Sequence, residues 1–199
     1  MRNLQRERRG FDRLQIIQSK TDYSHLRFTG RATQMNDTQK LAFELQLDKL
    51  RLRGSEHLDL AGCMLAACSA HDPSPETQLA VIHFLIDSGV SVNETDKNGV
   101  TPLHRAVRFR SLVAVDLLLA NGADVHATDR KSHSTALHRA VTNSGAPATA
   151  GKTDVAAAIV RSLLSHGADP TAKNKKGKSP ADYRISDTIA LAFNQNNSG

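Results

Sequence analysis

The sequence predicts an all-α solenoid, in which short helix–turn–helix units stack side by side. Two observations lead to this fold class. Three helical segments with the same apolar pattern end at Gly89, Gly122 and Gly167, so that 33 and 45 residues separate their ends. Two similar hexapeptides, TPLHRA at 101–106 and TALHRA at 135–140, precede the second and third segments. Repetition at intervals of about 20–50 residues is typical of repeat proteins.

The three helical segments cover residues 81–89, 114–122 and 159–167. Each places apolar residues at positions i, i+1, i+4 and i+5, which form one stripe along a helix and predict a buried side. The glycine that follows each stripe suits the left-handed conformation of a helix C-cap. We therefore expect three similar helices, each ending at its glycine.

The hexapeptides predict how a first helix begins. The hydroxyl of Thr101 can cap the helix, and Pro102 suits the first helical position, where its missing N–H is not needed. Residues 101–106 match the signature T-P-L-H-x-A at every fixed position, and 135–140 differ only in Ala136. The chain therefore resembles the ankyrin-repeat family, which has a period of 33 residues. The resemblance implies three to four stacked helix pairs with β-hairpin or loop fingers.

The chain divides into an arm, a repeat domain and a tail. Residues 1–36 form a basic N-terminal arm, 37–193 the ankyrin-repeat domain, and 194–199 a polar tail that is expected to fray. In segment 37–55, apolar alternation over 41–47 suggests a strand, whereas length and Glu, Lys, Gln and Arg content suggest a helix. We favour one capping helix, because an open stack needs its first apolar face covered.

Four repeats follow within the domain, at 56–95, 96–128, 129–173 and 174–193. The first has a predicted helix over 60–69, and a loop containing Pro73 and Pro75 precedes its second helix. The third carries an exposed inserted loop, 143–153. The fourth has Ser179 for Thr and Asp182 for His, and ends early with a short helix over 188–193, as a capping repeat would.

The turn between the two helices of the second repeat departs from the family pattern. The family usually has Gly-His there, whereas this chain has Arg110 and Ser111. Without glycine, the turn must adopt an ordinary backbone conformation or bear some strain.

The net charge of +6 is not spread evenly. Residues 1–31 hold eight cations and three anions, which leaves the rest of the chain close to neutral. The arm has a loose apolar stripe at Leu4, Phe11, Leu14 and Ile17, and a disordered tail or a helix docked on the stack is its simplest interpretation. It offers three aromatic side chains for base stacking, Phe11, Tyr23 and Phe28, and we expect single-stranded nucleic acid to be a less favoured ligand.

Cysteine use and hydropathy bear on the compartment. Cys63 and Cys68 are five residues apart in a predicted helix, or about 7.5 Å along its axis, and disulfide Cα atoms are usually within about 7 Å. We expect two buried thiols in a reducing compartment, and hence the cytoplasm. The longest apolar run, 60–68, is about half of the roughly 18 residues that a membrane span needs. No transmembrane segment and no secretory signal are expected.

Three patterns that resemble catalytic or ligand sites have simpler structural interpretations. Residues 145–153 approach a phosphate-binding loop, but Gly145 is one place off and no buried strand precedes it. His104 and His138 occupy signature positions, where hydrogen bonding toward the Thr and a neighbouring loop is the expected role. With no Cys-x-x-Cys and no His pair at ligand spacing, we expect no metal, no cofactor and no enzyme activity.

The resemblance implies where a partner would bind. Ankyrin partners commonly contact the hairpin tips and the exposed side of the first helix. Arg105, Arg108 and Arg139 are expected to line one concave strip, with Phe109 as an apolar anchor among them. By position, the candidate partner-binding residues are Lys97, Asn98, Val100, Arg105, Arg108, Phe109, Lys131, His133, Arg139, Thr142 and Asn143.

The predicted function is therefore a non-catalytic protein–protein interaction module, a monomer whose partner presents an acidic segment. A solvated basic surface without a partner is the plain alternative for these cations. The second candidate function is binding of an anionic surface or nucleic acid by the arm and the Lys-rich last hairpin, Lys173, Lys175, Lys176 and Lys178. Chemistry hidden in the N-terminal segment is a third hypothesis without a motif in its favour.

Overall fold

The computed structural model describes residues 36–53, 59–70, 74–142, 153–183 and 186–195, all within the compact unit Met35–Gly199. The described helices are α2 (Asp37–Phe43), α3 (Leu47–Arg53), α4 (Cys63–Ala67), α5 (Pro75–Asp87), α6 (Pro102–Arg108), α7 (Leu112–Ala120), α8 (Ala136–Val141), α9 (Thr153–Ser165), the 3-10 helix η2 (Pro180–Asp182) and α10 (Asp187–Gln195). The arm 1–36, except Asn36, lies outside the described residues, as do most of the inserted loop and the end of the tail.

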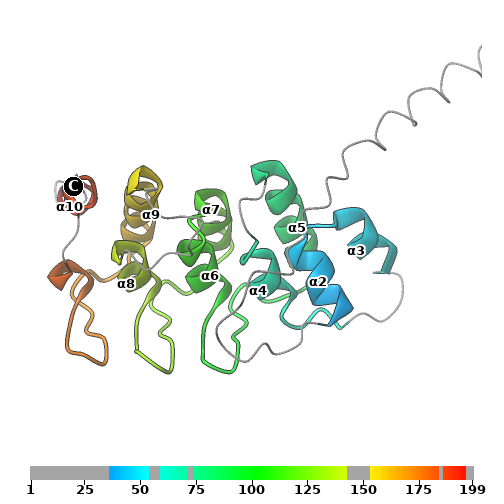
Figure 1. Ribbon diagram of the computed structural model, residues 1–199, viewed down its shortest axis with the longest axis horizontal. Coiled ribbons are helices and arrows are strands. Elements are labelled where there is room, and N and C mark those ends of the chain that lie inside the picture. Colours follow the sequence, from blue (N-terminus) through cyan, green and yellow to red (C-terminus); the bar gives the residue numbers. More distant parts are fainter. Residues whose placement is uncertain (1–35, 54–58, 71–73, 143–152, 184–185, 196–199) are drawn as a thin grey trace, which may run out of the picture. The chain divides into compact units, whose positions relative to one another are not determined.

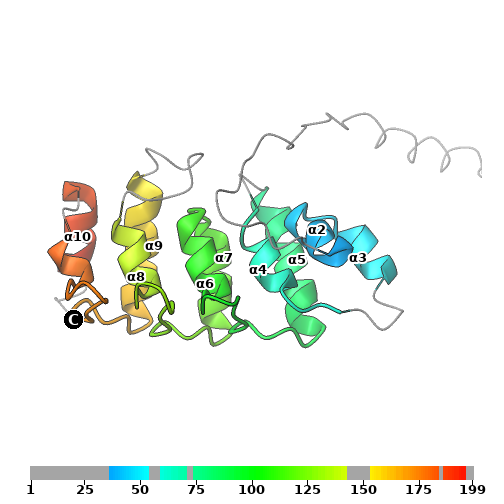
Figure 2. The same ribbon diagram turned by 60° about the horizontal axis from the view of Figure 1, so that its bottom comes forward.

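The helices form two parallel rows, which confirms the predicted all-α solenoid (Figures 1 and 2). Helices α2, α4, α6 and α8 pack one on the next in the first row, and η2 follows α8. Helices α3, α5, α7, α9 and α10 form the second row in the same order. Each unit contacts mainly its neighbours, as expected for a stacked repeat protein.

The core lies between the rows and runs through the described stack. The predicted apolar stripes supply it: Ile82, Leu118 and Leu163 are fully buried, each within one of the three matched helices. Burying such a side chain contributes about 1.5–3 kcal/mol. Gly89, Gly122 and Gly167 all have a φ near +80°, so the left-handed ends predicted for these helices are confirmed.

The first helices begin as the hexapeptides predict. The Thr101 hydroxyl accepts a hydrogen bond from the His104 N–H at 3.3 Å, and Thr135 does the same for His138 at 3.4 Å. Loss of proline at Ala136 leaves this cap in place, because the hydroxyl rather than the ring makes the bond. In the last repeat the Asp182 carboxylate accepts from the N–H and hydroxyl of Ser179, at 2.7 and 2.8 Å.

The single capping helix predicted over 37–55 is wrong. Two helices, α2 and α3, meet at a turn in which Leu45 has a φ of +55° and is nearly buried. Helix α2 packs on α4, and α3 packs on α5. Residues 41–47 cross the turn between these two helices, so their apolar residues belong to the buried sides of two different helices rather than to one strand. The stack therefore begins with a complete helix pair.

Two boundaries of the first repeat also differ from prediction. Helix α4 spans Cys63–Ala67 rather than 60–69. Gly62, its N-cap, has a φ of +77°, and this left-handed conformation prevents the helix from beginning earlier. Pro75 belongs to helix α5 instead of the preceding loop. It is the first residue of α5, after the N-cap Ser74, the position where proline costs no hydrogen bond.

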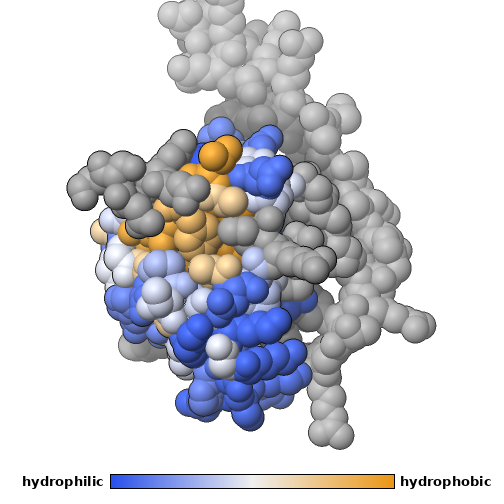
Figure 3. All heavy atoms as spheres, turned by 90° about the vertical axis from the view of Figure 1, so that its left-hand side faces the viewer, coloured by the Kyte–Doolittle hydropathy of each residue, from blue (hydrophilic) through white to orange (hydrophobic). Residues whose placement is uncertain are grey.

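The α10 end of the described stack has two surfaces of different character. Figure 3 shows apolar side chains gathered in its upper part and hydrophilic side chains over its lower part, toward the last loop. Leu191 of α10 is 60% exposed, while Ile189 and Ala192 of the same helix are buried.

Candidate functional site

Three loops project from the same edge of the stack just before α6, α8 and η2 (Figure 1). We call residues 96–100, 129–134 and 174–178 the fingers. In each finger, the first side chain accepts hydrogen bonds from backbone N–H groups of the turn. Asp96 accepts from Asn98 at 2.8 Å, Asp129 from Lys131 at 3.0 Å, and Asn174 from Lys176 at 2.9 Å. These bonds hold the finger tips in defined turns.

Neighbouring fingers are joined by backbone hydrogen bonds. The Arg130 N–H donates to the Asn98 carbonyl at 2.8 Å, and the Lys175 N–H donates to the Ser132 carbonyl at 2.9 Å. No strand is assigned to any described finger, so they are turns linked by single bonds. The bonds fix the position of each tip relative to the next.

A charged or polar bond ties each finger to the helix that follows it. The Asp96 carboxylate lies 2.9 Å from the Arg105 guanidinium, and Asp129 lies 3.2 Å from that of Arg139. In the last repeat, the Asn174 amide donates to the Tyr183 hydroxyl at 2.7 Å, so a neutral bond replaces the ion pair. Burial opposes the charge on Asp129, but bonds from Ser132 and Arg139 outweigh it and lower its pKa to about 2.

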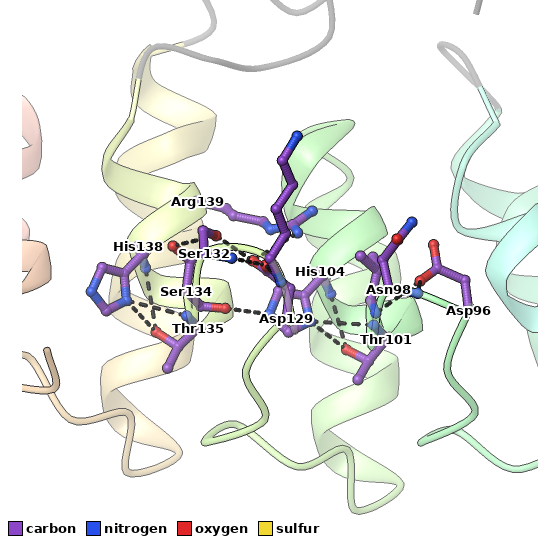
Figure 4. A network of polar contacts seen from close by, with 12 residues as sticks. Asp96, Asn98, Thr101, His104, Asp129, Ser132, Ser134, Thr135, His138 and Arg139 are labelled. Carbon is purple, nitrogen blue, oxygen red and sulfur yellow. Dashed lines mark hydrogen bonds and ion pairs between the residues drawn. The ribbon is translucent and has the colours of Figure 1, made fainter. Parts of the chain in front are cut away.

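The signature histidines connect one repeat to the next (Figure 4). His104 Nδ1 lies 2.8 Å from the Thr101 hydroxyl, and its Nε2 donates to the Ser134 carbonyl at 3.0 Å. His138 repeats the arrangement with Thr135 and the Lys178 carbonyl, also at 3.0 Å. Burial, assisted by the charge of Arg139, lowers the pKa of His104 to about 4. The structural role predicted for both histidines is confirmed.

Arg110 performs a role that the sequence did not indicate. It has a φ of +57°, so the turn without glycine adopts the left-handed conformation after all. Its guanidinium donates to the carbonyls of Ala140 and Thr142, both at 3.0 Å, at the end of α8 in the next repeat. Those carbonyls lack helical partners. The only signal in the sequence was an arginine where the family has glycine.

Two further polar side chains stabilise the first repeat and were missed. Glu94 accepts from the N–H groups of Gly62 and Leu65, both at 2.9 Å, and so caps α4, which lacks a Thr cap. Gln78 is fully buried, donates to the Ala67 carbonyl at 3.1 Å and accepts from the Ser111 hydroxyl at 2.5 Å. The bonds of Glu94 and Gln78 join residues that are 11 to 33 positions apart, so no local sequence pattern predicts them.

The predicted partner-binding residues fall into four groups. Lys97, Asn98, Arg108, Lys131 and His133 are exposed. Arg105, Arg139 and Thr142 are partly buried, and Asn143 lies outside the described residues.

Two of the predicted contact residues are buried. Val100 is 7% exposed and Phe109 is 8% exposed. The expectation of Phe109 as an exposed apolar anchor is therefore wrong. Phe109 is the C-cap of α6, where the chain turns back toward the stack, and Val100 closes the finger with its N–H bound to Asp96.

The structure brings the three arginines of the predicted strip together, but two of them are already paired. Burial lowers the pKa of Arg139, and the nearby charges of Arg105 and Arg108 act in the same direction. Asp96 and Asp129 neutralise Arg105 and Arg139. Arg108, which is exposed and has no carboxylate at ion-pair distance among the described residues, is the cation of this strip that a partner can reach.

Within the described ranges, no three His, Cys, Asp or Glu side chains come close enough to ligate a metal ion together. None of the helices described has the length and apolar character to span a bilayer. Cys63 and Cys68 are free and buried, as predicted, and burial raises the pKa of the Cys63 thiol to about 12. The phosphate-loop-like segment 145–153 lies outside the described residues except for Thr153.

The helix pairs form two rows, hydrogen bonds join neighbouring fingers, and the signature histidines bond one repeat to the next. This arrangement defines a repeat protein. The chain belongs to the ankyrin-repeat family, because the family model for ankyrin repeats (three copies) matches residues 63–174. Ankyrin repeats generally mediate protein–protein interaction.

Known proteins with similar sequences come from distant organisms. An ankyrin repeat protein of Fowlpox virus is 36% identical over 102 residues, which is 50% of this chain and 27% of the viral protein. Rabankyrin-5 of Mus musculus is 31% identical over 111 residues, 56% of this chain and 10% of that protein. Zygote-specific protein 3 of Chlamydomonas reinhardtii is 37% identical over 100 residues, 50% of this chain and 24% of that protein. The matches therefore span about a quarter or less of these relatives' lengths.

Proposed function

We propose that the fingers and the first helices bind a partner polypeptide without catalysing a reaction. The observation that carries the proposal is the bonding of the finger backbones. Asp96 and Asp129 hold the turns, and the Arg130 N–H joins the first two fingers at 2.8 Å. These bonds lie within the stack, while Lys97, Asn98, Arg130 and Lys131 at the tips are exposed.

Such rigidity favours binding, because little backbone conformational freedom remains to be lost when a partner docks. The exposed residues that the partner would contact are Lys97, Asn98, Arg108, Lys131 and His133. Arg105 and Arg139 play a smaller part in this proposal than the sequence predicted. Their guanidinium groups pair with Asp96 and Asp129. A partner that bound these arginines instead would break the ion pairs and destabilise the fingers.

The proposal is tested by comparing polypeptides captured from a cell extract by the immobilised full chain and by two variants. The finger variant carries Lys97→Glu and Lys131→Glu, both on exposed tips. The control variant carries Lys49→Glu and Arg161→Glu, which make the same charge change on the exposed sides of α3 and α9.

We expect the wild type and the control to capture the same polypeptides, and the finger variant to lose at least one of them about tenfold. Far-UV circular dichroism verifies that both variants are folded. Identical capture by all three proteins would refute the assignment of binding to the fingers.

A further inference from the structure

The finger tips carry cations and no acids. The first tip position is Lys97, Arg130 or Lys175 in the three successive fingers, and all three are exposed. The second position adds Lys131 and Lys176, also exposed. Residues 97–100, 130–134 and 175–178 contain no Asp or Glu. A column of cations therefore runs across the fingers, one from each repeat.

The acids beneath this column do not neutralise it. Asp96 and Asp129 bind turn N–H groups through one oxygen, and Arg105 and Arg139 through the other. No carboxylate of the described residues lies within ion-pair distance of the three column cations. Arg130 donates through Nη1 to the Lys97 carbonyl at 3.2 Å, which leaves further guanidinium donors for a ligand.

The spacing of the column follows from the stacking of the repeats. Helices α6 and α8 pack directly against each other, and packed helices lie about 8–10 Å apart. The fingers share this translation because single hydrogen bonds join each to the next. A polypeptide in the extended polyproline II conformation rises about 3.1 Å per residue with three residues per turn, so every third side chain points to the same side at intervals of about 9 Å, roughly one repeat.

We propose that the column binds an extended acidic segment of a partner protein, with a carboxylate at every third residue for Lys97, Arg130 and Lys175. The proposal rests on the proposed function and names the chemistry and register of the partner. Nucleic acid fits less well, because the tips have no Phe, Tyr or Trp on which bases would stack. A membrane surface fits less well too, because Val100, the aliphatic tip residue, is buried.

The test measures fluorescence anisotropy of labelled peptides with the full chain. One peptide carries four Glu residues, one at every third position of a Ser and Thr background. A second peptide has the same composition with its four Glu residues adjacent. Exposed ion pairs each change affinity by about 1.5- to 5-fold, so three aligned pairs predict about tenfold tighter binding of the spaced peptide.

The variant Lys97→Glu with Lys175→Glu should abolish this preference, and the control Lys49→Glu with Arg161→Glu should retain it. Equal affinity of both peptides for the wild type would overturn the three-residue register. Tighter binding of a single-stranded oligonucleotide or of phosphatidylserine vesicles, lost in the variant Lys97→Glu with Lys175→Glu, would show that this polyanion, rather than a protein segment, is the ligand. If no peptide binds while extract polypeptides still depend on Lys97 and Lys131, the acidic segment is refuted and the proposed function stands.

Discussion

Replacing Arg110 tests whether its cross-repeat bonds outweigh the strain of its backbone. The residue has a φ of +57°, which costs a non-glycine residue about 1–2 kcal/mol. In return its guanidinium bonds to the Ala140 and Thr142 carbonyls, both at 3.0 Å. Glycine would relieve the strain and remove the bonds, whereas alanine would remove the bonds and keep the strain.

The magnitudes decide the sign. A hydrogen bond from a charged group contributes about 1.5–3 kcal/mol, and we halve the sum of two because Arg110 is only partly buried. The two bonds then contribute about 1.5–3 kcal/mol. Arg110→Ala is expected to lower the free energy of unfolding by about 1.5–3 kcal/mol. Arg110→Gly is expected to lower it by only about 1 kcal/mol, because relief of strain offsets most of the loss.

Urea unfolding monitored by far-UV circular dichroism measures these differences. Arg108→Ala is the matched control: Arg108 is exposed, so its loss should change stability by less than about 0.5 kcal/mol. Hydrogen exchange should also be faster in α8 of the Arg110 variants, since the lost bonds cap that helix. An Arg110→Gly variant more stable than the wild type would show that strain dominates and would refute the argument.

Two further predictions concern the contacts between fingers and repeats. In the folded chain the pKa of His104 is about 4, below its ordinary value of 6.5. As the pH falls from about 6.5 to 4, the unfolded chain therefore binds a proton that the folded chain does not, and the free energy of unfolding should decrease. The loss from pH 7 to pH 5 should be about 2 kcal/mol by denaturation, and a pH profile unchanged in His104→Gln would count against it. Gly99→Ala should lower stability by about 1 kcal/mol more than Gly177→Ala, because both glycines have a φ of +70° but only at Gly99 would the new Cβ meet Arg130 Cγ, at 3.0 Å. Equal melting temperatures of the two alanine variants would contradict this explanation.

Local patterns were enough to predict the start of each signature helix. The Thr101 hydroxyl and the His104 ring are three residues apart, so one turn of helix brings them together wherever that helix forms. The same reasoning holds for Ser179 and Asp182, where different residue types perform the same capping role. The glycines that end the second helices were predictable because a left-handed residue is needed at one position next to each helix.

The candidate binding residues were predicted less well, because position within a repeat does not determine exposure. Phe109 occupies the exposed side of α6 by family position, but the chain turns after Arg108 and buries it. Arg105 and Arg139 were expected to face a partner and instead hold the fingers' aspartates. These differences depend on neighbouring backbone that the hexapeptide does not specify.

The repeat pattern alone established the class of fold and the order of most helix pairs. Apolar stripes, N-cap residues and C-terminal glycines each act within one helix or the turn next to it. They can therefore be recognised from the sequence alone. The complete N-terminal helix pair, the cap that Glu94 provides for α4 and the bonds from Arg110 to α8 appeared only once the repeats were stacked. Each joins groups brought together by packing of one repeat on the next, and such contacts have no fixed spacing along the chain. The same holds for the charges of the repeats, which are close to neutral in sum: stacking places Lys97, Arg130 and Lys175 in one column, with Asp96 and Asp129 hydrogen-bonded beneath it.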